Sequence, residues 1–159
     1  MNIEIAFIKE CEIQKIADIY KQRLAGNCPV EKTAKMELPN SYEAILKDEQ
    51  KRKVVIFPID DKWVGVMEVK EVNDYDLLLY ISEVCATTVV NVLFADSVAG
   101  CGYAVFEQGN VTASEFHEEE YEECEEFIEE VLERYEIDYV LLTFPMIMRD
   151  REMEKTIVQ

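Results

Sequence analysis

The chain has 159 residues, and its 16 Lys and Arg stand against 34 Asp and Glu, which gives a formal net charge of −18. Hydrophobic residues make up 49% of it, so the chain is not wholly disordered and has enough apolar material for a buried core. The charge argues against binding to duplex DNA or to an anionic membrane surface, because both kinds of binding depend on Lys and Arg. We therefore expect a single domain over residues 1–159, with neither nucleic acid nor a membrane as a partner.

The N-terminal residues and the cysteines both favour a cytoplasmic protein. The first nine residues lack the cationic start of a secretory signal, and no apolar stretch approaches the roughly 18 residues of a membrane span. The cysteines are odd in number and never spaced as Cys-x-x-Cys, so they are poor evidence for zinc or for a disulfide framework. Three of them fall on apolar stripes or beside a strand and are expected in the core. The five cysteines are Cys11, Cys28, Cys85, Cys101 and Cys124.

The first third of the chain predicts a strand followed by two helices. Residues 2–8 are rich in Ile and Phe and are typical of a strand. Apolar residues then recur at helical spacing from Ile13 to Leu24, and Gly26 offers a C-terminal stop. After an irregular connection, the spacing of a capping box predicts a short helix over residues 40–51.

The middle of the chain predicts hairpins around one helix. Two β-rich segments within residues 54–69 flank a polar turn. Asn73 has the character of a helix N-cap, and the apolar spacing after it predicts a helix to about residue 85. A buried strand is expected over residues 87–95, and another hairpin over residues 103–116 turns at Gly109.

The last third contains the clearest helical pattern and a final strand. Apolar residues at spacings of three and four predict an acidic amphipathic helix near residues 117–136. A strand is expected over residues 139–144, followed by a polar tail, residues 145–159, for which a frayed end and a short helix are both open. Because hairpins outnumber clear β-α-β crossovers, we expect a single α+β domain whose mostly antiparallel sheet carries helices mainly on one face.

The stretch from Trp63 to Phe116 resembles a pattern found in uncharacterised bacterial proteins. In that pattern a strand containing Trp leads through acidic residues to a helix, and a buried strand then closes with Asp-Ser before an aromatic strand and a Gly turn. The corresponding residues are Trp63, Asp74, Asp76, Ile81, Ser82, Asp96, Ser97, Tyr103–Phe106 and Gly109. The resemblance implies the order strand, helix, strand and hairpin, and it implies no activity.

Half of the formal charge lies in the predicted acidic helix. Residues 117–135 contain ten glutamates and one arginine, a charge of −9. Residues 1–80 carry 12 cations and 15 anions, whereas residues 81–159 carry 4 and 19. A surface of one sign steers an oppositely charged partner, although a merely solvated face is the alternative explanation. We therefore expect a non-enzymatic interaction protein, with an inhibitor or immunity-type role, that binds a basic protein through Glu118, Glu119, Glu122, Glu123, Glu126 and Glu130.

A small enzyme or ligand-binding domain is the alternative function. His117 is the only histidine, so any Ser-His or Cys-His mechanism would have to use it. The alternative site is a cavity in which Asp96, Ser97, Cys101, Tyr103 and His117 converge. The chain has no nucleotide-binding motif and no Glu-x-x-His metal motif, so we expect neither a cofactor nor a metal. A homodimer formed by pairing sheet edges is a third reading.

Overall fold

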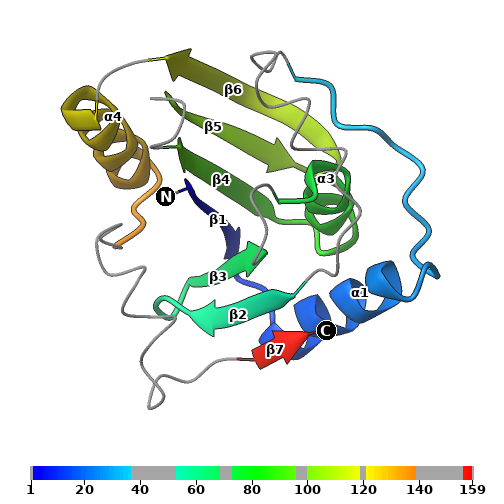
Figure 1. Ribbon diagram of the computed structural model, residues 1–159. Coiled ribbons are helices and arrows are strands. Elements are labelled where there is room, and N and C mark those ends of the chain that lie inside the picture. The colour runs from blue at the N-terminus through cyan, green and yellow to red at the C-terminus, as the bar shows by residue number, and fades with distance from the viewer. Residues whose placement is uncertain are drawn as a thin grey trace.

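The computed structural model describes residues 2–36, 53–68, 73–95, 100–118, 121–138 and 156–158. Figure 1 labels the elements that these residues form. In chain order they are β1 (Asn2–Lys9), α1 (Ile13–Leu24), β2 (Val54–Pro58), β3 (Trp63–Glu68), α3 (Tyr75–Val84), β4 (Thr88–Ala95), β5 (Gly100–Glu107), β6 (Asn110–Glu118), α4 (Tyr121–Arg134) and β7 (Thr156–Val158). The helix expected over residues 40–51 and the strand expected over residues 139–144 lie outside the described residues.

The described strands form one seven-stranded sheet in the order β6-β5-β4-β1-β3-β2-β7. Every adjacent pair is antiparallel, which confirms the expected α+β class. The connections β2–β3, β4–β5 and β5–β6 join neighbouring strands as hairpins, whereas α1 and α3 each cross over to a strand that is not adjacent. The inner order β4-β1-β3-β2 with these two crossovers is the split β-α-β, or ferredoxin-like, arrangement.

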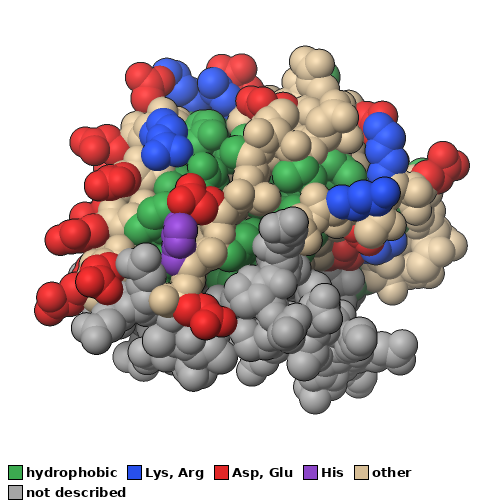
Figure 2. Space-filling model, turned by 90° about the horizontal axis from the view of Figure 1, so that it is seen from above, with side chains coloured by type: hydrophobic (Ala, Val, Ile, Leu, Met, Phe, Trp, Pro, Cys, Tyr) green, Lys and Arg blue, Asp and Glu red, His purple; other side chains and the backbone are tan. Residues whose placement is uncertain are grey.

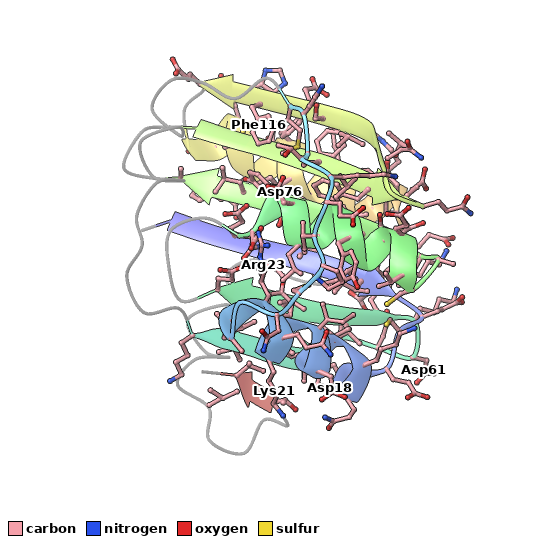
Figure 3. All side chains as sticks on the ribbon, turned by 90° about the vertical axis from the view of Figure 1, so that its right-hand side faces the viewer. Asp18, Lys21, Arg23, Asp61, Asp76 and Phe116 are labelled. Carbon is pink, nitrogen blue, oxygen red and sulfur yellow. The ribbon has the colours of Figure 1, made fainter. Side chains whose placement is uncertain are left out.

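The described helices cover both faces of the sheet, with α1 and α3 on one side and α4 on the other (Figures 1 and 3). Residues of α1 and α3 share one hydrophobic cluster, and residues of α4 belong to a separate cluster. Alternate residues along β1 enter different clusters, as the two-residue period of a strand requires: Ile5 and Phe7 face α4, whereas Ala6 and Ile8 face α1 and α3. The expectation of helices mainly on one face is confirmed, and the acidic helix α4 is the described helix on the opposite face.

The α1 and α3 face has an additional outer cover. The chain after α1 runs over α3, where the Ala34 backbone N–H donates to the Asp76 carboxylate at 2.7 Å and the Lys32 ammonium lies 3.3 Å from the Glu83 carboxylate. Figure 3 shows this segment crossing in front of α3. Because α3 lies between the sheet and this segment, most of its residues are buried, including Leu79, which the apolar spacing did not include.

Two sequence-based assignments at helix starts are wrong. His117 and Glu118 belong to β6, because they continue its pairing with β5 opposite Cys101 and Gly100, and α4 begins only at Tyr121. The N-cap of α3 is Asp74, whose side chain accepts from the Leu77 N–H at 3.1 Å. Its predecessor Asn73 is instead buried in a polar network described below.

The C-terminal strand β7 lies within the segment expected to be a polar tail. Its residues Thr156–Val158 pair with β2 in the register Val54 to Val158, and Val158 is buried. None of the helices that the structure describes has the length and apolar character needed to cross a lipid bilayer.

Candidate functional site

The outward surface of α4 is a row of carboxylates. The helix contains seven glutamates and one arginine, a formal charge of −6. Six of the glutamates are exposed and Glu125 is half-buried. Figure 2 shows acidic side chains in a column along the edge of the molecule formed by α4, whereas Lys and Arg accompany Asp and Glu elsewhere in that view. The acidity of the chain is therefore displayed on a rigid element.

The position of α4 on the sheet explains why its glutamates face solvent. Its apolar stripe, Cys124, Ile128, Val131 and Leu132, is buried against the face of the sheet that carries Ile5 and Phe7. Since 3.6 residues make one turn, the residues between these positions point away from the sheet. The single cation of the helix, Arg134, is exposed, and its guanidinium donates to the Tyr103 hydroxyl at 3.3 Å and lies over the Tyr103 ring.

The structure brings together most, but not all, of the predicted partner-binding residues. Glu122, Glu123, Glu126 and Glu130 are exposed on α4. Glu118 is exposed at the end of β6, not on the helix, and Glu119 lies outside the described residues. The prediction omitted two exposed glutamates on the same surface, Glu129 and Glu133. Their spacing of three and seven residues from the chosen glutamates is the sequence signal that could have identified them.

Three residues of the alternative site lie on the face of the sheet beneath α4. Cys101 and His117 are directly paired across β5 and β6, so their Cβ atoms are about 4.5–5.5 Å apart. Tyr103 lies two residues along β5 on the same face. Asp96 and Ser97 lie outside the described residues. The sheet register therefore makes Cys101 and His117 neighbours on one face.

The environment of these three residues is filled by aromatic packing. The Phe127 ring of α4 stands edge-on to the His117 ring with centroids 5.0 Å apart, and it lies 5.9 Å from the Tyr103 ring. The His117 Nε2 atom is 2.7 Å from the Glu115 carboxylate. Cys101 is only 1% exposed, so its sulfur is shielded from a substrate in this conformation. A nucleophile must be reachable, and this arrangement therefore favours a packing role for Cys101.

The small residues around Cys101 have a structural explanation. A Cβ atom built on Gly102 would lie 2.1 Å from Cδ1 of Phe116, its cross-strand partner. The Phe116 ring thus occupies the space that a side chain at position 102 would take. Gly102 provides room for an aromatic ring, and it does not open a path to the thiol.

A buried polar network lies on the other face of the sheet, and the sequence-based prediction missed it. The two carboxylate oxygens of Glu4 accept from the Asn73 backbone N–H at 2.8 Å and from the Asn91 side-chain amide at 2.7 Å. The Asn73 amide donates to the Asn91 side-chain oxygen at 2.8 Å, and Glu68 accepts from the Asp74 N–H at 2.9 Å. The sequence feature that could have predicted this network is Asn91 in an otherwise apolar strand, because a buried polar residue needs hydrogen-bond partners.

The pKa of Glu4 is raised to about 7, chiefly by burial and to a smaller extent by the nearby Glu68 carboxylate. Hydrogen bonds from Tyr75, Asn91 and Asn73 act in the opposite direction. Close to the network, the Arg23 guanidinium of α1 pairs with Asp74 at 2.9 Å. The network links β1, β3, β4 and the start of α3, so it fixes how α3 meets the sheet.

The described residues offer no cluster of three or more His, Cys, Asp or Glu side chains placed to hold a metal ion. Comparison with protein-family models, with curated proteins and with solved structures finds no match to the chain. The acidic surface of α4 and the cysteines therefore have to be interpreted from their own geometry.

Proposed function

We propose that this protein is a cytosolic, non-enzymatic interaction protein that binds a basic protein through the exposed glutamates of α4. The observation that carries the proposal is that six exposed glutamates share the outward surface of one packed helix, whose single arginine, also exposed, is hydrogen-bonded to Tyr103 of the sheet. A solubility role alone would be served equally well by mixed Glu and Lys. An inhibitor or immunity-type role suits such a surface, because a basic partner would be both attracted and covered.

The surface predicts the character of the binding. Among the described residues, the large hydrophobic side chains that are exposed are Val84 and Ile157, and neither is on α4. Tight interfaces are usually anchored by buried aromatic or aliphatic groups, so α4 by itself supplies attraction and orientation more than a slow dissociation rate. We therefore expect fast association that slows steeply with added salt.

The test begins with capture of cytosolic proteins from the source cell at low salt, followed by elution at high salt. Each captured protein is purified, and its association rate is measured against three forms of this chain: the wild type, a variant with four glutamates of α4 changed to glutamine, and a charge-matched control. The variant carries Glu122→Gln, Glu126→Gln, Glu129→Gln and Glu130→Gln. The control carries Glu10→Gln, Glu12→Gln, Glu31→Gln and Asp61→Asn, which are exposed and lie outside α4.

We expect the α4 variant to associate at least about tenfold more slowly at low salt, and the control to associate nearly as fast as the wild type. Equal slowing in both variants would mean that total charge, not α4, attracts the partner. No slowing in either would also contradict the proposal. A rise in apparent mass without any other protein bound would favour the homodimer.

A further inference from the structure

Two cysteines that are 74 positions apart in the sequence meet at one edge of the α1 and α3 layer. The sulfur atoms of Cys11 and Cys85 are 3.3 Å apart, and both residues are free and half-buried. Cys11 lies in the connection from β1 to α1, and Cys85 is the C-cap of α3. Because both are partly exposed, a small solute can reach them, unlike the buried thiols of Cys101 and Cys124.

The backbone on either side holds these two cysteines in place. Glu10, just before Cys11, and Ala86, just after Cys85, both have a φ of 47°, the left-handed region that non-glycine residues seldom adopt. The Thr87 hydroxyl donates to the Lys9 carbonyl, which ties the end of β1 to the start of β4. The close approach of the sulfurs therefore follows from two fixed turns, and it does not depend on a mobile loop.

The electrostatic surroundings distinguish one thiol of the pair. The Cys11 thiol donates to the Cys85 sulfur, and this hydrogen bond together with the Lys15 ammonium lowers the pKa of Cys85 to about 7, although burial opposes the shift. The pKa of Cys11 is raised, chiefly because its S–H is the donor to that sulfur. Burial also raises the pKa of Cys28, the other half-buried cysteine on this face. Cys85 is thus the thiol that is most readily ionised near neutral pH.

We propose that Cys11 and Cys85 form a redox-active dithiol that reacts with a low-molecular-weight disulfide and closes reversibly to a Cys11–Cys85 disulfide. In the first step the Cys85 thiolate attacks one sulfur of the small disulfide RSSR, which forms a mixed disulfide and releases RS⁻. In the second step Cys11 gives its proton to the released RS⁻, and its sulfur attacks the Cys85 sulfur and expels the second RS⁻. The protein loses two electrons to RSSR, which leaves as one small thiol and one small thiolate.

The position of the pair gives the disulfide a structural effect. It would join the start of α1 to the end of α3, the two helices that cover one face of the sheet. The acidic surface of α4 lies on the opposite face, so this inference is independent of the proposed function. The reactant is oxidised glutathione or a similar small disulfide, because both cysteines are partly exposed and Cys85 lies beside the Lys15 ammonium.

Oxidised glutathione is the probe for the test. The folded wild-type protein is equilibrated in mixtures of reduced and oxidised glutathione, quenched with acid, alkylated and mapped by mass spectrometry. We expect one intramolecular link, between Cys11 and Cys85, with loss of two hydrogen atoms and full reversal by reduced glutathione. Cys11→Ser should instead accumulate a glutathione adduct on Cys85, because the second step has lost its nucleophile. Cys28→Ser is the matched control and should close as the wild type does.

The rate of alkylation tests the role assigned to Cys85 without any oxidant. At neutral pH about half of Cys85 is ionised, whereas burial raises the pKa of Cys28 and keeps its thiol protonated. Although an acidic thiol is intrinsically less nucleophilic, Cys85 should therefore react with iodoacetamide faster than Cys28. Lys15→Gln should shift the pH midpoint of this reaction upward, while its circular dichroism spectrum stays that of the wild type.

Three results would overturn the inference. The first is a wild-type protein in which both thiols remain open to alkylation at every glutathione ratio. The second is glutathione attached equally to Cys28 and Cys85, with no link to Cys11. The third is an alkylation midpoint for Cys85 that equals that of Cys28. None of these results depends on whether α4 binds a basic protein.

Discussion

The buried carboxylate of Glu4 makes the stability of the fold depend on pH in a calculable way. Its pKa is raised from 4.5 to about 7, first by burial and then by the Glu68 carboxylate. An acid whose pKa is higher in the folded state favours folding when it is protonated. The stabilisation is complete below pH 4.5, and it is lost as the pH rises through 7. A shift of this size corresponds to about 3 kcal/mol between these limits.

The perturbation that isolates this effect is Glu4→Gln, which cannot ionise. A glutamine can accept only one of the two hydrogen bonds that Glu4 accepts from Asn73 and Asn91, and its amide group would face the other donor. We expect this mismatch to cost about 1–3 kcal/mol at about pH 5, where Glu4 is largely protonated. Since only the wild type is penalised as the pH rises, the two stabilities should converge by about pH 8.

The assay is urea unfolding at a series of pH values, followed by the fluorescence of Trp63. This residue is the single tryptophan and is 2% exposed, so unfolding changes its environment strongly. Glu10→Gln, at an exposed position just beyond β1, is the control and should run parallel to the wild type. A constant difference between wild type and Glu4→Gln from about pH 5 to 8 would refute the reasoning.

Three further predictions concern single positions. Ala86 has a positive φ just after α3, as Gly26 does just after α1. Ala86→Gly should therefore raise the free energy of unfolding by about 0.5–1 kcal/mol, and Gly26→Ala should lower it by a similar amount. Urea titrations under reducing conditions measure both changes. Gly102→Ala should destabilise by about 1–3 kcal/mol because its Cβ would overlap the Phe116 ring, and a double-mutant cycle with Phe116→Ala should recover part of the loss. Glu129→Gln removes the like-charge contacts with Glu125 and Glu133, one turn before and after it on α4. The free energy of unfolding should rise by about 0.4–1 kcal/mol at low salt, seen as a higher thermal midpoint, and this gain should disappear at high salt.

Local sequence patterns predicted most of the described elements, although not β7, and they did not predict the arrangement of the strands in the sheet. The helical spacing from Ile13 to Leu24 and the apolar run at residues 87–95 correspond to α1 and β4 within a residue or two. The central position of β1 depends on pairing with β3 and β4, which lie far along the chain. No short window of sequence carries that information, so counting hairpins gave the sheet type and not its strand order.

The candidate sites show the same limit. The acidic helix could be read from composition, because charge and helical period are both local. Cys11 and Cys85 could not be paired in advance, since a separation of 74 residues matches no cysteine motif and the contact exists only when α1 and α3 lie together. A buried hydrogen-bond partner for Asn91 could have been predicted, because an amide within a buried strand needs one. Only the sheet register identifies Glu4 as that partner.

The packing of α4 determines how a loss of binding must be interpreted. Burial of Ile128, Val131 and Leu132 contributes about 1.5–3 kcal/mol for each side chain as an upper estimate. The four like-charge pairs at i, i+4 within α4 oppose this by only about 1–2 kcal/mol in all. Replacing glutamates with glutamine removes the smaller, unfavourable contribution and leaves the larger one intact. The helix therefore stays docked in such variants, and slower binding by them reports the loss of charge and not the loss of the helix.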